Sequence, residues 1–114
     1  MPVIAFFEGD LVADPDLSVS PEGSPVCEVV VRPMPRSERQ RAQRERASEP
    51  PTYHVTAVDD DAYALASLPE GARVVIIGQV KAVSWVDEAG ARHRRDTVVV
   101  DSLGQSIHAG ALVA

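Results

Sequence analysis

The sequence has little of what secreted, membrane and metal-binding proteins need. Its 114 residues include one cysteine, Cys27, so no disulfide can form within the chain. The longest apolar runs, such as Val74–Ile77, are far shorter than the roughly 20 residues that span a bilayer, and no secretory leader pattern is present. The three histidines, His54, His93 and His108, follow no zinc-ligand spacing. We therefore expect a cytoplasmic protein with no metal, no cofactor and no membrane partner.

Aromatic residues are also scarce, at 4% of the chain. A chain of this length buries roughly two thirds of the surface that it exposes when unfolded, which is enough for one core. We expect a single domain over residues 1–114, which excludes a bilobed enzyme. No nucleophile, base and orienting residue stand at a recognisable catalytic spacing, and Cys27 has no histidine or asparagine context. The sequence therefore predicts a binding protein and not an enzyme.

The net charge of −6 is unevenly distributed. Residues 1–31 carry six acidic residues and no basic one, whereas residues 32–46 carry six arginines against two glutamates. The remaining residues carry five basic and nine acidic side chains, and three of the five form the cluster Arg92, Arg94 and Arg95. Arginine binds phosphate bidentately and stacks on bases. Because charges more than about 8 Å apart are screened at physiological salt, the overall charge does not exclude a nucleic-acid partner.

Runs rich in valine and isoleucine, separated by turn signals, predict an all-β domain. The expected strands are Val3–Val12, bent at Gly9, then Leu17–Ser20 as a short continuation, Val26–Arg32, Tyr53–Val58, Arg73–Ser84 and Arg92–Asp101. Asp59–Asp61 begins the predicted helix as its cap, since three consecutive aspartates lack the spacing of a calcium loop, and Pro69–Gly71 ends it. This order matches a five-stranded OB-fold barrel with one short helix between the third and fourth strands. An unrelated small β-barrel is the alternative.

Residues 33–51 differ in composition from the rest of the chain, because prolines bracket a polar, arginine-rich stretch. They predict a long mobile loop or an extended hairpin tip. Gln40–Ala47 has the propensity for a helical turn but no apolar stripe that would hold it against a core.

Five segments follow one another in a distinctive order. They are Gly9–Leu17, Ser20–Gly23, Tyr53–Val55, Gly71–Lys81 and Trp85. Their order and spacing, over roughly residues 3–109, resemble the bacterial single-stranded DNA-binding protein family. The resemblance implies sequence-independent binding of single-stranded DNA in replication, recombination or repair. It also implies a homo-oligomer, with a tetramer favoured over a dimer.

The sequence departs from the family pattern in three places. Pro33–Glu38 contains no aromatic residue where the family has one, and another family aromatic falls near Asp59. Only Tyr53 and Trp85 occupy the expected stacking positions. No acidic C-terminal tail follows Val113-Ala114, which indicates either a paralogue without the tail's recruiting role or a shortened chain.

The candidate site combines cations that follow a phosphate backbone with flat rings on which bases stack. Its predicted members are Arg32, Arg36, Arg39, Arg41, Arg44, Tyr53, Lys81, Trp85, Arg92, Arg94 and Arg95. Trp85 is expected outside the core, with Arg92 and Arg94 near it across the turn. Tyr53 is assigned equally to the binding face and to the barrel rim. The alternative for the arginine-rich loop is a solvated segment without a partner.

The other aromatic residues are assigned to packing. Tyr63 is expected to plug the barrel from the helix. Phe6 and Phe7 point to opposite faces of one strand, so one of them is expected in the core and the other at an interface or a loop.

Two alternatives change the function and keep the fold. Ser20–Cys27 and the tailless end also resemble a primosome-type adaptor, a dimer that acts mainly through protein–protein contacts with replication proteins. A specialised paralogue that barely binds DNA is the other alternative. The oligomeric mass separates the first two functions, since a tetramer supports DNA binding and a dimer supports the adaptor.

Overall fold

The computed structural model describes residues 3–34, 38–46 and 51–107, with the side chains of residues 38, 40 and 44 left out. Arg36 and the predicted tailless end lie outside the described residues. The strands are β1 (Val3–Leu11), β2 (Asp16–Val19), β3 (Pro25–Pro33), β4 (Tyr53–Val58), β5 (Arg73–Val86) and β6 (Arg92–Gln105). The helices are α1 (Glu38–Arg46) and α2 (Asp60–Ala66). Neither helix is long and apolar enough to cross a membrane.

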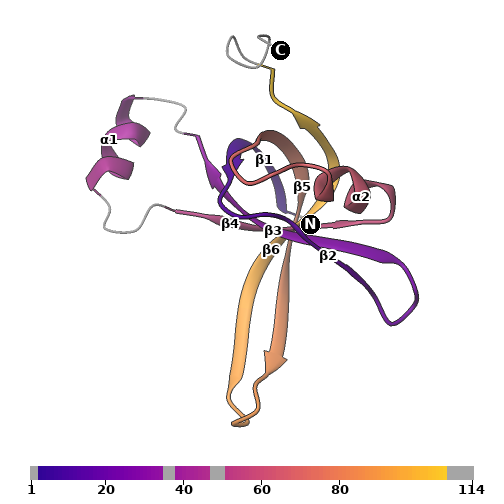
Figure 1. Cartoon of the computed structure of the whole chain (residues 1–114). Coiled ribbons are helices and arrows are strands. Elements are labelled where there is room, and N and C mark those ends of the chain that lie inside the picture. The colour runs from indigo at the N-terminus through magenta and orange to yellow at the C-terminus, as the bar shows by residue number, and fades with distance from the viewer. Residues whose placement is uncertain (1–2, 35–37, 47–50, 108–114) are drawn as a thin grey trace.

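Five strands form a closed ring of hydrogen-bonded pairs, with β2 attached to the side of β3 (Figure 1). Around the ring, β1 pairs with β5, β5 with β6, β6 with β4, β4 with β3, and β3 with β1. Every pair is antiparallel except β4 with β6. The helix α2 connects β4 to β5, the third and fourth strands of the ring. This is the arrangement of an OB-fold barrel, and the predicted fold class is confirmed.

The core follows directly from the alternation of valines along the strands. On β3, Cys27, Val29 and Val31 are buried while Glu28 and Arg32 between and after them are exposed. Successive side chains of a strand point to opposite faces, so one face of each strand lines the barrel interior. Among the described residues, the buried apolar side chains are those of Phe7, Leu11, Cys27, Val29, Val31, Val55, Ala57, Ala62, Leu65, Val74, Ile76, Val98 and Val100.

Two glycines stand where the strands pass one another most closely. Gly9 is the residue at which β1, already paired with β5, also begins to pair with β3. Gly78 lies at a bulge between β5 and β6. A Cβ atom at either position would collide with a backbone carbonyl, that of Arg32 or that of Val99. Glycine is therefore required for the barrel to close.

The helix α2 covers one end of the barrel, and it corrects two sequence predictions. Ala62 and Leu65, three residues apart, are fully buried, and this places Tyr63 on the outer face with 58% of its surface exposed. The prediction that Tyr63 fills the core was wrong. Asp59 holds the N-cap position but its side chain makes no capping hydrogen bond; its carbonyl oxygen instead accepts a bond from the Ala62 N–H at 3.0 Å.

The helix α1 was not expected as a regular element, since the prediction was a mobile loop or hairpin tip with a helical turn at most. It stands apart from the barrel in Figure 1, and its described side chains are all exposed. Whereas α2 packs against β2, β3, β4 and β6, no comparable packing joins α1 to any element in the described ranges. Local helix propensity is therefore what specifies α1, consistent with its missing apolar stripe.

Candidate nucleic-acid interface

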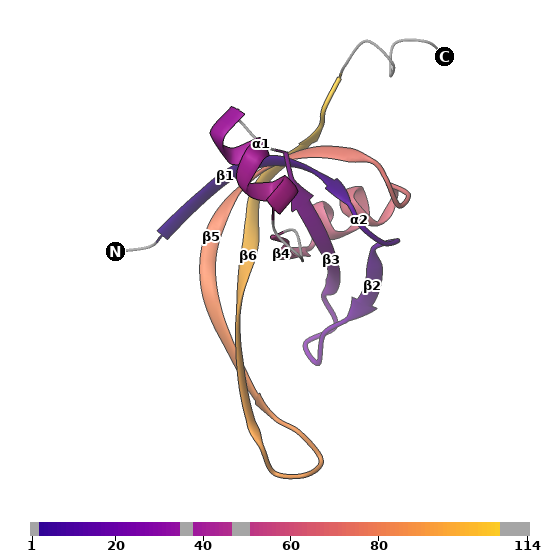
Figure 2. The same cartoon turned by 90° about the vertical axis from the view of Figure 1, so that its left-hand side faces the viewer.

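The strands β5 and β6 continue beyond the barrel as a long hairpin (Figures 1 and 2). We call residues 81–97 the hairpin arm. Its pairing runs from Lys81 opposite Thr97 to Val86 opposite Arg92. At its tip, the Asp87 N–H donates to the Ala91 carbonyl oxygen at 3.0 Å. The arm is thus an extension of barrel strands and not a separate loop.

Strand register divides the side chains of the arm between two faces, because directly opposite residues share a face and neighbours along a strand do not. Trp85 is opposite His93 and Val83 is opposite Arg95, so these residues lie on one face together with Lys81. Arg92 and Arg94 are opposite Val86 and Ser84, and these four residues form the other face.

Trp85 lies outside the core, as expected, with 42% of its surface exposed. The His93 ring stacks on it, with ring centroids 5.3 Å apart and planes 19° from parallel. The guanidinium carbon of Arg95 lies 5.3 Å from the centroid of the indole. Arg92 and Arg94 were the arginines predicted beside the Trp85 ring. In the structure the guanidinium group over this ring belongs to Arg95. Arg92 and Arg94 border the same hollow of about 370 Å³ as Trp85, but the register turns them to the other face.

His93 is a site residue that the sequence analysis missed, because histidines were considered only as metal ligands or catalytic bases. The predicted turn at residues 87–90 would place Arg92 opposite Trp85. In the structure Ala91 also belongs to the turn, and this shift of one residue brings His93 opposite Trp85.

The cations of the arm have no carboxylate partner within the described part of the chain. The ion pairs found there are Arg73–Asp10 at 3.3 Å and His93–Asp87 at 2.6 Å. Lys81, Arg92 and Arg94 are exposed. The Arg95 Nε atom is buried without a hydrogen-bond partner among the described groups. The arm thus carries four basic and three acidic side chains, and none of the four basic ones is held in an ion pair among the described residues.

The remaining predicted cations lie elsewhere. Arg39 and Arg41 are exposed on α1. Arg44 is on the same helix, but its side chain is not among the described ones. Arg36 lies outside the described residues. Arg32 is exposed on β3, opposite Asp10, and Asp10 is in turn opposite Arg73 at the start of β5. The structure thus places Arg32 at the other end of β5 from the arm.

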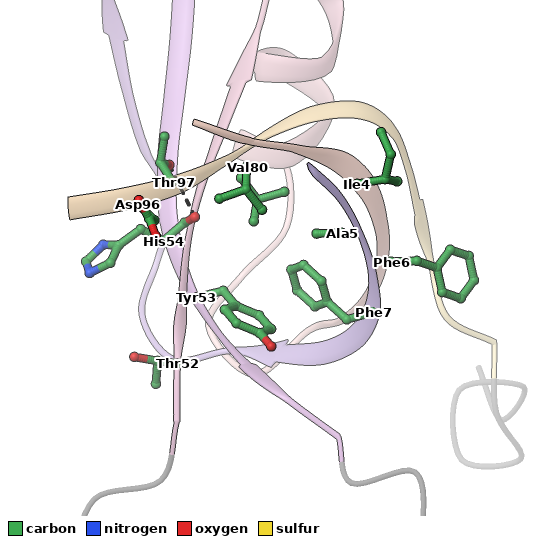
Figure 3. Close-up of a pocket in the computed structure, with 11 residues that line it drawn as sticks. Ile4, Ala5, Phe6, Phe7, Thr52, Tyr53, His54, Val80, Asp96 and Thr97 are labelled. Atoms are coloured by element: carbon green, nitrogen blue, oxygen red, sulfur yellow. Dashed lines mark hydrogen bonds between the residues drawn. The ribbon is translucent and has the colours of Figure 1, made fainter. Parts of the chain in front are cut away.

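Tyr53 stands at an open mouth of the barrel, drawn in Figure 3, and 43% of its surface is exposed. Its ring packs against that of the buried Phe7, with centroids 4.7 Å apart and planes at 57°. Tyr53 therefore packs at the rim, as one of its two assignments predicted, and part of its surface remains open to solvent. Phe6 is 56% exposed and Phe7 6%, as their opposite faces predicted.

The mouth is a cavity of about 560 Å³. Its lining extends from Tyr53 and the first residues of β1 to Asp96 and Thr97, which form the base of the hairpin arm. Tyr53 and the arm therefore border one continuous region of the surface.

No group of three or more histidine, cysteine, aspartate or glutamate side chains is placed to hold a metal in the part of the chain that the structure describes. Cys27 is fully buried, and burial raises the pKa of its thiol, with Asp16 and Glu28 adding to the effect. A thiol in this environment is a poor nucleophile.

Comparison with known proteins agrees with this geometry. The model of the single-strand binding protein family matches residues 4–106. A single-stranded DNA-binding protein of Paenarthrobacter aurescens is 27% identical over 100 residues, which are 87% of this chain and 58% of that protein. The crystal structure of a deletion mutant of the single-stranded DNA binding protein from Thermus aquaticus gives a TM-score of 0.66 at 20% identity. That match covers 92% of this chain and 41% of the Thermus chain, so this chain spans about half the length of such relatives. Since the family model covers most of its residues, the chain belongs to the single-strand binding protein family.

Proposed function

We propose that this protein binds single-stranded DNA without sequence preference and acts in DNA replication, recombination or repair. The observation that carries the proposal is the exposed Trp85, which lies beside Arg95 on an arm whose cations have no described carboxylate partner. A base stacked on an aromatic ring contributes about 1–3 kcal/mol, and cations along the strand bind phosphates. The names of the two similar proteins support this proposal. In it the protein acts by binding alone, without catalysis or a cofactor.

The proposed path of the DNA follows the hairpin arm and the neighbouring mouth of the barrel. Trp85 and Tyr53 supply the rings, and Lys81, Arg92, Arg94 and Arg95 supply charge beside them. The arginines of the segment at 33–51 add phosphate contacts from Arg36, Arg39, Arg41 and Arg44. Arg32 contributes least, because Asp10 is its neighbour across β1 and β3.

We also propose that the protein is a homo-oligomer, most simply a tetramer, in the cytoplasm and associated with the nucleoid. The support is the edge of β1, where the pairing with β3 covers Gly9–Leu11. Towards the N-terminus, Val3 and Ile4 are 63% and 57% exposed. A strand edge with exposed apolar side chains is a template for pairing with a second copy. Light scattering tests the assembly: a tetramer supports it, and a dimer favours an adaptor of replication proteins.

The decisive experiment measures the binding of labelled oligo-dT by fluorescence anisotropy, with stoichiometry, at two salt concentrations. Binding governed by phosphate contacts should weaken by about 0.7 log units per contact for each tenfold increase in salt. Duplex DNA of equal length is the control, and it should bind far more weakly because its bases cannot stack on Trp85. An affinity for oligo-dT that barely changes with salt, or that equals the affinity for duplex, contradicts the proposal.

A further inference from the structure

The tip of the hairpin arm holds a histidine and an aspartate in a defined pair. His93 Nε2 and Asp87 Oδ2 lie 2.6 Å apart, and because an ionised carboxylate can only accept, the His93 Nε2–H is the donor. The second oxygen, Asp87 Oδ1, accepts the Ala91 N–H at 2.9 Å, which anchors the carboxylate to the turn. A neutral imidazole that donates from Nε2 carries its free lone pair on Nδ1. Asp87 therefore orients the ring and leaves Nδ1 as the atom that takes up a proton.

The same ring enlarges the flat surface of Trp85. The two rings are 19° from parallel with centroids 5.3 Å apart, an offset stack. Side-chain exposures of 44% for His93 and 37% for Asp87 leave both accessible to a ligand. A nucleobase that approaches Trp85 thus meets a second ring whose charge depends on pH.

We propose that His93, oriented by Asp87, is part of the DNA-stacking surface and that protonation of His93 at Nδ1 strengthens DNA binding. This inference rests on the function proposed above. With a neutral imidazole the pair carries one negative charge beside the DNA, and with an imidazolium it carries none. Histidine is the side chain whose charge changes between about pH 5 and 8. The affinity for single-stranded DNA should therefore rise as the pH falls through this range.

The other charged groups around His93 come from the hairpin arm itself. Arg95 and Lys81 share its face of the arm, Arg92 and Arg94 flank it along β6, and Glu88 is exposed in the turn. The hydrogen bond from His93 lowers the pKa of Asp87, with the Ala91 N–H adding to the effect. Asp87 thus stays ionised while His93 takes up its proton, so the change in charge belongs to the imidazole.

The first test uses the free protein, so it does not depend on DNA binding. The chain has one tryptophan, so its emission reports on Trp85 alone. A protonated imidazole in contact with an indole quenches the fluorescence of the indole. Emission should fall between pH 8 and pH 5.5 in the unmodified protein and in His54→Gln, and should stay level in His93→Phe, which keeps a ring but cannot titrate. A level emission in the unmodified protein overturns the contact.

The second test measures the Kd for oligo-dT at pH 5.5 and pH 8. The unmodified protein should bind about two- to five-fold more tightly at pH 5.5, the size of one exposed charge contact. His93→Phe should lose this difference, and His54→Gln should keep it. Asp87→Asn, which retains an oxygen for the Ala91 N–H, should bind more tightly than the unmodified protein at pH 8. Glu88→Gln removes the same charge from the same turn and should leave the pH dependence intact.

The outcomes separate this inference from the proposed function. Absence of oligo-dT binding at both pH values rejects the function. Binding without pH dependence, or with a pH dependence that His93→Phe retains, rejects the role of His93 and leaves DNA binding standing. Unchanged melting temperatures of the variants exclude unfolding as the cause.

Discussion

Two arginine-bearing arms extend from the same barrel, and they differ in how they are held in position. The helix α1 carries Arg39 and Arg41 on an exposed element that has no apolar stripe and no packing against the described barrel. The hairpin arm carries Arg92, Arg94 and Arg95 on strands that continue the barrel's own hydrogen-bonded ladder. One arm is therefore fixed in position by the fold, whereas among the described residues no comparable packing fixes α1.

The difference determines what each arm would contribute to the proposed binding of DNA. An arm without a fixed position still attracts phosphate, because electrostatic attraction acts over several ångströms. Stacking requires a ring held at the correct place, because the ordering of mobile groups costs entropy. The only tryptophan of the chain lies on the arm that the fold fixes. We infer that α1 mainly raises the rate at which DNA associates, and that the hairpin arm mainly lowers the rate at which DNA dissociates.

The largest expected effect comes from a change at the root of the hairpin arm. Gly78→Ala places a Cβ against the Val99 carbonyl and the Val98 side chain, so the backbone must shift. We expect a loss of about 3 kcal/mol in the free energy of unfolding, measured by urea denaturation. The matched change in the other arm, Ala42→Gly, should cost α1 about 1 kcal/mol locally and leave the unfolding of the barrel unchanged. Equal losses in the free energy of unfolding of the two variants would contradict the inferred difference between the arms.

Removal of the Trp85 ring should have the next largest effect, a loss of affinity for oligo-dT. Trp85→Ala should weaken the binding of oligo-dT by about 2 kcal/mol, roughly 30-fold, and Trp85→Phe should weaken it less because a ring remains. Anisotropy with a labelled oligonucleotide measures both variants without relying on tryptophan emission. Unchanged affinity in Trp85→Ala would remove this residue from the site.

Neutralising two arginines in each arm gives a direct comparison of the arms. Arg92→Gln with Arg94→Gln, and separately Arg39→Gln with Arg41→Gln, should each reduce the salt dependence by up to about 1.4 log units per decade of salt. The hairpin pair should raise the dissociation rate more, and the α1 pair should mainly lower the association rate. Stopped-flow measurements test this, and the reverse pattern would show that α1 is the arm that holds the DNA.

The smallest expected effect concerns acid pH at the hairpin tip. The bond from His93 lowers the pKa of Asp87, so the contribution of Asp87 to the turn is complete above the ordinary aspartate range and is lost as the pH falls through the lowered value. The Ala91 amide, which donates to Asp87, should show this transition in an NMR titration. Asp87→Asn should abolish the transition, and α1 amides should not report it.

The fold was largely predictable from sequence because its determinants are local. Alternating valines predicted the strands, and Gly9 predicted the bend in β1. The order of strands around one helix was enough to choose the topology. Trp85 was placed outside the core for an equally local reason, namely its position beside a charged turn.

The errors share a physical cause, because each depended on an orientation that local sequence does not specify. Tyr63 was assigned to the core, but Ala62 and Leu65 fix the rotation of α2 and turn the larger ring outward. Arg92 and Arg94 were expected beside Trp85, although alternation along β6 puts Arg95 on the face of the indole. The role of His93 required the register of the hairpin. The helix α1 shows the opposite case, in which local propensity alone was sufficient and was undervalued.

The parallel pairing of β4 with β6 has a consequence for how the chain folds as it is made. Val55 meets Val98 across this pairing, so the ring stays open until the last strand has been synthesised. The interior faces of β1, β3 and β4 remain exposed to water during translation, because only β6 can complete their burial. Such long-range closure slows folding and leaves unpaired strand edges open to aggregation. We expect nascent chains that end before Val98 to depend on chaperones, and the completed chain to be released from them once β6 has paired.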